Sequence, residues 1–282
     1  LIDDDGASSG DDDFQSYYQD ALIAAGVVSV VWDIAEEGIP SFAWLQDKPQ
    51  VIWYTGNNDT PLNDLSTSLM STYLNGGGQM LLSGQHIASD DENVQELLSQ
   101  FFAAERMPED INSIFVYGDP SHDMINVEDR FTVGSASGAA NQTSPDGFNV
   151  LEGGASLFVY PFMDNTASGV SKKTASYSSI LLGFGLEALS PFGGDAVYAR
   201  GSLMQRMLEW LDADYVSVVE ETFSLPGTAG ITSAYPNPFN PSISFNINMV
   251  AGAKGQIQIL NLRGAVVETF EVSGSGLYAW QP

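Results

Sequence analysis

The chain contains no cysteine in its 282 residues. Disulfide bonds, thiolate metal ligands and cysteine nucleophiles are therefore excluded. Basic residues are scarce, with 9 Lys and Arg against 36 Asp and Glu, so the formal net charge is −27. Such an acidic chain repels nucleic acids and anionic lipids, which makes cations, glycans and other proteins the more suitable partners. No apolar run approaches the roughly 18 residues of a membrane span, so we expect no membrane insertion.

Residues 1–212 alternate short β-branched runs with segments of helical spacing. The expected strands are Leu1–Asp4, Val27–Asp33, Gln50–Thr55, Gln79–Ser83 and Ser179–Phe184. Apolar residues recur at helical spacing in segments 14–25, 62–73 and 203–211. Strands that alternate with helices predict an α/β domain with a doubly wound, mainly parallel sheet. Between residues 111 and 178, short strands and Gly, Ser and Asn turns predict a β-rich insertion over one end of that sheet.

The order of motifs in this region is informative. Asp-Asp-Asp-Gly follows the first strand, Val-Ile-Trp-Tyr-Thr-Gly begins at Val51, and Gly-Gly-Gly-Gln-Met-Leu-Leu-Ser-Gly-Gln begins at Gly76. With Leu182-Gly-Phe-Gly-Leu-Glu187, this order resembles the flavodoxin-like domain, related to class I glutamine amidotransferases, that accompanies secreted peptidase and sorting domains. The resemblance implies a flavodoxin-like sheet, but a fold does not carry an activity with it.

The resemblance also points to one turn. Amidotransferases of that class place a nucleophilic Cys on the sharp turn after a central strand and a His-x-Glu pair after a later strand. Here the turn reads Leu82-Ser83-Gly84-Gln85-His86, and Gly185 stands where the His before Glu187 would be. We therefore expect the amidotransferase reaction to be lost.

Ser83, His86 and Glu187 remain as candidate catalytic residues. A serine hydrolase would need a histidine base beside Ser83, and only His86 and His122 exist. The alternative is that Ser83 is a turn residue, His86 a hydrogen-bonded polar side chain and Glu187 a carboxylate at a helix start.

An acidic cluster is the candidate metal site. Asp3, Asp4 and Asp5 follow the first strand, and Asp11, Asp12 and Asp13 precede the first helix. No Lys or Arg occurs before Lys48. Ligands of doubly wound sheets bind at the carboxyl ends of strands, and hard oxygen ligands suit Ca²⁺. The alternative is that Asp11–Asp13 cap the helix while the other three are solvated.

Two weaker patterns remain open. Six aromatic residues could form a sugar-stacking platform at the sheet edge, although core packing is the more frequent role of such residues. They are Trp32, Trp44, Trp53, Tyr54, Tyr17 and Tyr18. His122 and Asp123, beside Asp119 and Glu128, could form a metal-binding loop or simply a polar turn.

The last fifty or so residues have a different pattern. Tyr235-Pro-Asn-Pro-Phe-Asn-Pro241 contains three prolines, which exclude a helix. Alternating runs follow in segments 243–249, 257–262 and 266–270, which predicts a small antiparallel β-sandwich-type domain. With Ile-Leu-Asn-Leu-Arg-Gly264, this region resembles the C-terminal sorting domain of the type IX secretion system. The resemblance implies export to the surface or medium of a Gram-negative bacterium, with the export machinery as a partner.

The two ends suggest processing. Leu1-Ile2-Asp3 resembles the second half of a strand, and Trp280-Gln-Pro282 stops before the final strands that the sorting-domain resemblance implies. We therefore expect a partial sorting domain and cleavage boundaries at both ends. A sheet edge left open in this way invites a partner strand.

These patterns divide the chain into an α/β domain (1–212), a linker (213–230) and a partial sorting domain (231–282). The function expected is that of a non-catalytic structural or binding module of a secreted or cell-surface protein. One alternative is a subunit of an extracellular surface assembly or filament held by strand-mediated contacts. The other is a secreted hydrolase, or an accessory domain of a secreted peptidase, that acts at the Ser83 turn.

Overall fold

The computed structural model describes residues 1–108, 111–164, 166–212, 230–235, 242–248, 254–260, 266–273 and 276–281. The chain divides into two compact units, Leu1–Val216 and Ser217–Pro282. The predicted linker lies outside the described residues except for Gly230, and the proline-rich segment lies outside them except for Tyr235.

The first unit is built on a sheet whose parallel part has the order β2-β1-β3-β4-β11. Its strands are β1 (Ile2–Asp3), β2 (Trp32–Asp33), β3 (Gln50–Tyr54), β4 (Gln79–Ser83) and β11 (Ser178–Leu182). This is the doubly wound flavodoxin-like order, so the predicted fold class is confirmed. The expected strand Val27–Asp33 is wrong for most of its length, because the two-residue β1 pairs only with Trp32 and Asp33.

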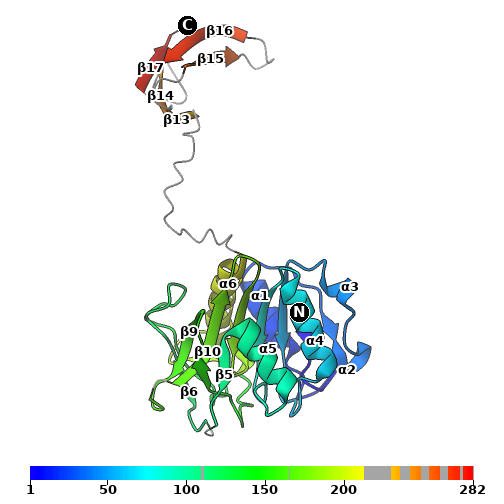
Figure 1. The fold of residues 1–282 in the computed structure, drawn as a ribbon. Coiled ribbons are helices and arrows are strands. Elements are labelled where there is room, and N and C mark those ends of the chain that lie inside the picture. The colour runs from blue at the N-terminus through cyan, green and yellow to red at the C-terminus, as the bar shows by residue number, and fades with distance from the viewer. Residues whose placement is uncertain are drawn as a thin grey trace. The chain divides into compact units, whose positions relative to one another are not determined.

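Helices cover both faces of the parallel sheet (Figure 1). α1 (Gln15–Ala24) and α6 (Ala196–Asp212) pack with Ile52, Leu81 and Ile180. α4 (Asp64–Asn75) and α5 (Glu92–Phe102) pack on the opposite face with residues such as Met80 and Leu181. Alternate strand residues therefore point to opposite helix layers. The short helices α2 (Ile34–Glu37) and α3 (Phe42–Leu45) precede β3.

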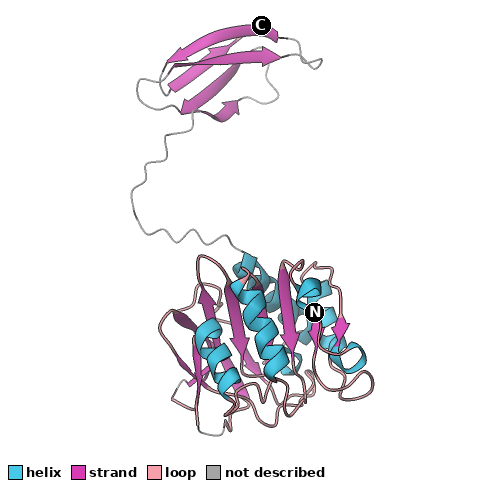
Figure 2. Cartoon of the chain, turned by 45° about the vertical axis from the view of Figure 1, so that its right-hand side comes forward, coloured by secondary structure: helices cyan, strands magenta, loops and turns pink. Residues whose placement is uncertain are grey.

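The β-rich insertion continues the sheet instead of covering its end (Figure 2). β10 (Thr166–Lys173) pairs antiparallel with β11, and β9 (Gly154–Tyr160), β6 (Phe115–Gly118), β7 (Arg130–Thr132) and β12 (Ser190–Pro191) follow in that order. β5 (Ala104–Arg106) pairs with β8 (Phe148–Val150), which also pairs with β10. The expected placement was wrong because the backbone groups of β11 need a hydrogen-bonding neighbour on that side.

The described strands of the second unit form two small antiparallel sheets. One contains β13 (Gly230–Tyr235), β14 (Ile243–Asn248) and β17 (Gly276–Trp280), and the other contains β15 (Lys254–Leu260) and β16 (Val266–Ser273). Phe245 and Ile247 of the first sheet share a buried cluster with Val272 of the second. Two sheets that share a core form the expected sandwich-type arrangement.

None of the helices in the described part of the chain has the length and apolar character that crossing a membrane requires.

Candidate functional site at the carboxyl edge of the parallel sheet

Five parallel strands bring their carboxyl ends to one edge. Their last residues are Asp33 of β2, Asp3 of β1, Tyr54 of β3, Ser83 of β4 and Leu182 of β11. In doubly wound sheets, ligands bind outside this edge, close to the point where the strand order reverses. In this sheet the reversal lies between β1 and β3. A ligand-binding or catalytic site of this fold is therefore expected at this edge.

Ser83 is sealed inside a hydrogen-bond network. Its side chain is fully buried. The backbone N–H of Leu186 donates to Ser83 Oγ at 3.0 Å, and Ser83 Oγ donates to the carbonyl of Phe184 at 3.1 Å. The hydroxyl of Tyr18 lies 3.1 Å from the same atom. A hydroxyl with all of these partners and no solvent access cannot approach a substrate carbonyl.

Glu187 is the centre of the same network. It lies in the first turn of the 3₁₀ helix η1 (Leu186–Ala188), as expected for a carboxylate at a helix start, but it is fully buried. Its Oε2 accepts a hydrogen bond from the Tyr18 hydroxyl at 2.7 Å, and its Oε1 accepts one from Asn141 Nδ2 at 2.9 Å. Burial raises the pKa of Glu187, whereas these hydrogen bonds lower it. The carboxyl group thus joins α1, η1 and the loop at residue 141.

Neither histidine supports a catalytic serine. His86 Nε2 lies 3.4 Å from Asp59 Oδ1, and no histidine within the described ranges makes a hydrogen bond to Ser83. His122 lies elsewhere, where its Nε2 contacts Ser171 Oγ at 2.8 Å and its Nδ1 accepts the N–H of Met124. Burial lowers the pKa of His122, whereas the nearby Asp123, whose Oδ1 lies 3.4 Å from Nδ1, raises it. The described residues form no metal-ligand group around it.

Gln85 is a residue of this edge that the sequence did not single out. Its side chain is buried, and its Nε2 donates to the carbonyls of Gly56 (3.2 Å) and Asn141 (3.0 Å). Its Oε1 accepts the backbone N–H groups of Thr143 (2.7 Å) and Ser144 (2.9 Å). Gln85 therefore fixes the 141–144 loop against the edge. A glutamine after a tight turn carries no periodic signal, so the sequence alone could not indicate this role.

The acidic cluster divides into buried and exposed residues. Asp3, Asp4 and Asp5 are all less than 7 % exposed, so the expectation that they are solvated is wrong. Burial raises the pKa of Asp3 and of Asp4 to about 7. Asp11 and Asp12 are exposed.

The carboxylates of the six aspartates do not all lie close together. Carboxylate oxygens of Asp3, Asp5 and Asp13 all lie within 4.8 Å of one another. Asp4 instead accepts hydrogen bonds from Trp53 Nε1 (2.9 Å) and an Asn58 amide (3.2 Å). Asp12 accepts one from Asn57 Nδ2. Of the six candidate ligands, three therefore converge.

Helix capping accounts for little of this cluster. The N-cap residue of α1 is Phe14, and no side chain caps the helix there. Asp13 Oδ1 does accept the N–H of Gln15, the first residue of α1, at 3.0 Å. The expected division of labour, with Asp11–Asp13 at the helix start, therefore holds for Asp13 alone.

Three of the six aromatic residues belong to the buried core, and the other three, Tyr17 among them, are half-buried. Tyr18, Trp53 and Tyr54 are fully buried, so they offer no surface to a sugar. Trp32 and Trp44 are half-buried, with ring centroids 4.8 Å apart, and Lys48 Nζ lies 4.5 Å from the centre of the Trp44 ring.

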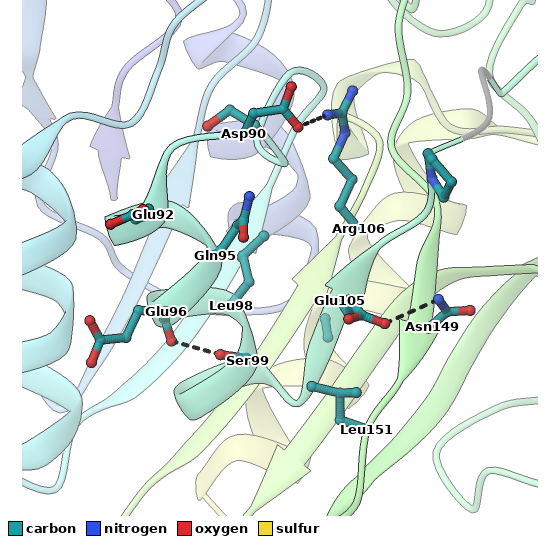
Figure 3. Close-up of a pocket in the computed structure, with 13 residues that line it drawn as sticks. Asp90, Glu92, Gln95, Glu96, Leu98, Ser99, Glu105, Arg106, Asn149 and Leu151 are labelled. Carbon is teal, nitrogen blue, oxygen red and sulfur yellow. Dashed lines mark hydrogen bonds and ion pairs between the residues drawn. The ribbon is translucent and has the colours of Figure 1, made fainter.

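A surface pocket of about 710 Å³ lies between α5 and the β5–β8 pair (Figure 3). Its polar groups contact one another: Arg106 Nη1 pairs with Asp90 at 2.6 Å, and Asn149 Nδ2 donates to Glu105 Oε2 at 3.3 Å. The described lining residues include no histidine, and Arg106 is the single basic residue among them. These described residues form no nucleophile–base pair.

Comparisons with known proteins give no family for this chain. No model of a protein family matches it, and no curated protein has significant sequence similarity to it. Among solved structures, a cytoplasmic protein of Salmonella typhimurium superposes with a TM-score of 0.49 at 10 % identity, covering 71 % of this chain and 87 % of that one.

Two other solved structures have comparable likeness. The mmIFT52 N-terminal domain gives a TM-score of 0.49 at 11 % identity, covering 71 % of this chain and 90 % of that one. A ThuA-like protein from Bacteroides uniformis gives 0.43 at 12 % identity, covering 70 % and 82 %.

Proposed function

We propose that the α/β unit is a non-catalytic structural or binding module of a secreted or cell-surface bacterial protein. The non-catalytic role is supported by the surroundings of Ser83. Its buried hydroxyl is within hydrogen-bond distance of Leu186, Phe184 and Tyr18. A nucleophile needs a base beside it and an open approach for the substrate. Both are missing from the described surroundings of this residue.

The role of Glu187 supports the same proposal. In an amidotransferase-like site, a carboxylate at this position would orient a catalytic histidine. Here it holds Tyr18 and Asn141, two side chains from distant parts of the sequence. The hydrogen bonds of Ser83 and Glu187 therefore join distant segments of the chain and stabilise the fold.

Export is proposed from the sequence of the C-terminal region. The Tyr235–Pro241 segment and the alternating strands behind it resemble a type IX sorting domain. The absence of cysteine and the charge of −27 are compatible with a protein that works outside the cell. The partners that follow are the export machinery and extracellular proteins or glycans.

Substitution of Ser83 tests the non-catalytic part. Ser83→Ala should leave any turnover of ester or amide substrates unchanged, and the purified protein should show none above background. The loss of the hydrogen bonds that this hydroxyl makes should still lower the free energy of unfolding by about 1–3 kcal/mol.

Ser179→Ala is the matched control, because Ser179 is equally buried and donates to the carbonyl of Phe101 at 2.6 Å. Hydrolysis by the unmodified protein that disappears in Ser83→Ala, with an unchanged circular dichroism spectrum, and persists in Ser179→Ala would contradict the proposal.

A further inference from the structure

We propose that Asp3, Asp5 and Asp13 form a binding site for a hard divalent cation, Ca²⁺ in particular, at the carboxyl end of β1. This proposal concerns a ligand of the fold and does not depend on where the protein works or on whether it catalyses a reaction.

The three carboxylates reach one point from separate positions. Asp3 ends β1, Asp5 follows in the loop, and Asp13 lies two residues before α1. Their oxygens lie within 4.8 Å of one another, which allows one ion to contact all three. Each carboxylate has about four lone-pair positions. Backbone N–H groups occupy some of them, such as those of Ala7 and Phe14 on Asp5, and acceptor capacity remains for a cation.

A second observation comes from Tyr54 at the end of β3. Its side chain is fully buried, and its hydroxyl has no partner that meets hydrogen-bond geometry. The hydroxyl nevertheless lies beside Asp3. Stacking on the Tyr18 ring, at a centroid distance of 4.0 Å, holds the Tyr54 ring in place. A water molecule held by the ion would donate a hydrogen bond to this oxygen and satisfy it.

The charge of the cluster is not balanced by protein groups. Within the described residues, none of the three aspartates makes an ion pair with Lys or Arg. Asp3 and Asp5 are buried, and buried carboxylates without a cation are costly. A dication would remove this cost by compensating two of the three negative charges.

The ligand set favours Ca²⁺ among divalent cations. All the converging atoms are oxygens, and neither histidine nor cysteine contributes, which disfavours zinc and copper. Asp13 is half-exposed, so waters can complete the six to eight ligands that Ca²⁺ accepts in flexible geometry. Mg²⁺ requires near-ideal octahedral geometry, which a site open to water beside the half-exposed Asp13 is less able to impose.

Terbium luminescence gives a direct test on the full chain. Tb³⁺ is a luminescent substitute for Ca²⁺ that is excited by nearby aromatic side chains, and Tyr54, Tyr18 and Trp53 surround this edge. We expect saturable Tb³⁺ emission that Ca²⁺ displaces. The melting temperature should rise by about 5–10 °C when Ca²⁺ exceeds its dissociation constant 100-fold. Mg²⁺ at the same concentration and ionic strength should give less than half of this rise.

The variants separate this site from general binding to an acidic protein. Asp13→Asn should lower the affinity for Ca²⁺ at least tenfold. Tyr54→Phe should lower this affinity severalfold while leaving the carboxylates in place. Asp11→Asn is the matched control, because it removes the same charge from an exposed position two residues away. It should leave Ca²⁺ affinity unchanged.

Three outcomes would overturn the proposal. One is the absence of saturable Tb³⁺ emission and of a Ca²⁺-dependent rise in melting temperature for the unmodified protein. A second is the same loss of affinity in Asp11→Asn and Asp13→Asn. An equal response to Mg²⁺ would overturn the assignment to Ca²⁺. Circular dichroism of each variant shows that a lost response is not a lost fold.

Discussion

Gly84 shows how closely two backbone segments approach at the carboxyl edge. A Cβ atom at this position would lie 1.8 Å from Thr55 Oγ1 and 3.0 Å from Thr55 Cβ. Thr55 is fully buried and donates to the carbonyl of Gln85, so it has little freedom to move. The turn after β4 therefore requires glycine for reasons of space, as the sequence comparison with a sharp catalytic turn indicated.

Gly84→Ala should lower the free energy of unfolding by about 1–3 kcal/mol, because the added methyl group displaces Thr55. Chemical denaturation measures this change. Gly193→Ala is the control, since a Cβ at Gly193 meets no atom within 4 Å, and it should change stability by less than about 0.5 kcal/mol. Equal effects of the two substitutions would show that the close contact with Thr55 is not the cause.

Asp146 connects several elements of the sheet. Its Oδ2 accepts the backbone N–H groups of Ile87 (2.8 Å) and Ala88 (3.2 Å), which follow β4. Its own N–H donates to the carbonyl of Gly183 after β11, and its carbonyl accepts the hydroxyl of Tyr160 in β9. Burial raises the pKa of Asp146 to about 7. The side chain and backbone of Asp146 thus fix the insertion to the parallel sheet.

This raised pKa predicts a pH dependence. Between the ordinary pKa of 3.8 and about 7, the folded state holds a proton that the unfolded state releases. The stabilisation is complete below 3.8 and is lost as the pH rises through about 7. Asp146→Asn keeps the acceptor oxygen without the charge, so at pH 8 it should be more stable than the unmodified protein by on the order of 2–4 kcal/mol.

Thermal melts from pH 4 to pH 8 measure this difference. The advantage of Asp146→Asn should grow with pH and vanish near pH 4. Asp47→Asn, at an exposed position, is the control for removing one negative charge. A pH-independent difference between Asp146→Asn and the unmodified protein would contradict the assignment of a protonated Asp146.

The whole molecule consists of two units, Leu1–Val216 and Ser217–Pro282, and the proposal gives them separate roles. If residues 231–282 carry an export signal, their deletion should keep the protein inside a bacterium that has type IX machinery. The α/β unit should still fold, because it has its own buried clusters on both faces of the sheet. Cell fractionation and immunoblotting measure the distribution.

A host that lacks the type IX machinery provides the control, and the unmodified chain should be retained there as well. Export of the deletion variant, or export that is independent of the machinery, would contradict the proposed role of the C-terminal unit. The folded state of the retained protein can be checked by its resistance to protease in the lysate.

The sequence by itself determined the fold class and the chemistry that is excluded. β3 and β4 match the expected strands at all but one position, because buried parallel strands are almost continuously apolar. The absence of cysteine removed the amidotransferase nucleophile without any structure. The helix α5 was not predicted. Its sequence nevertheless contains the pattern of a helix, with Asp91 as the N-cap and Leu97, Leu98 and Phe101 on the buried face.

Only the tertiary structure decided what the polar residues do. Ser83 is sealed because Tyr18 and Leu186, distant in the sequence, close over it. Three of six similar aspartates converge because the end of a strand and the start of a helix meet at one edge. The burial and the hydrogen-bond partners of a polar side chain depend on which distant segments pack together. The neighbouring residues in the sequence do not determine this packing.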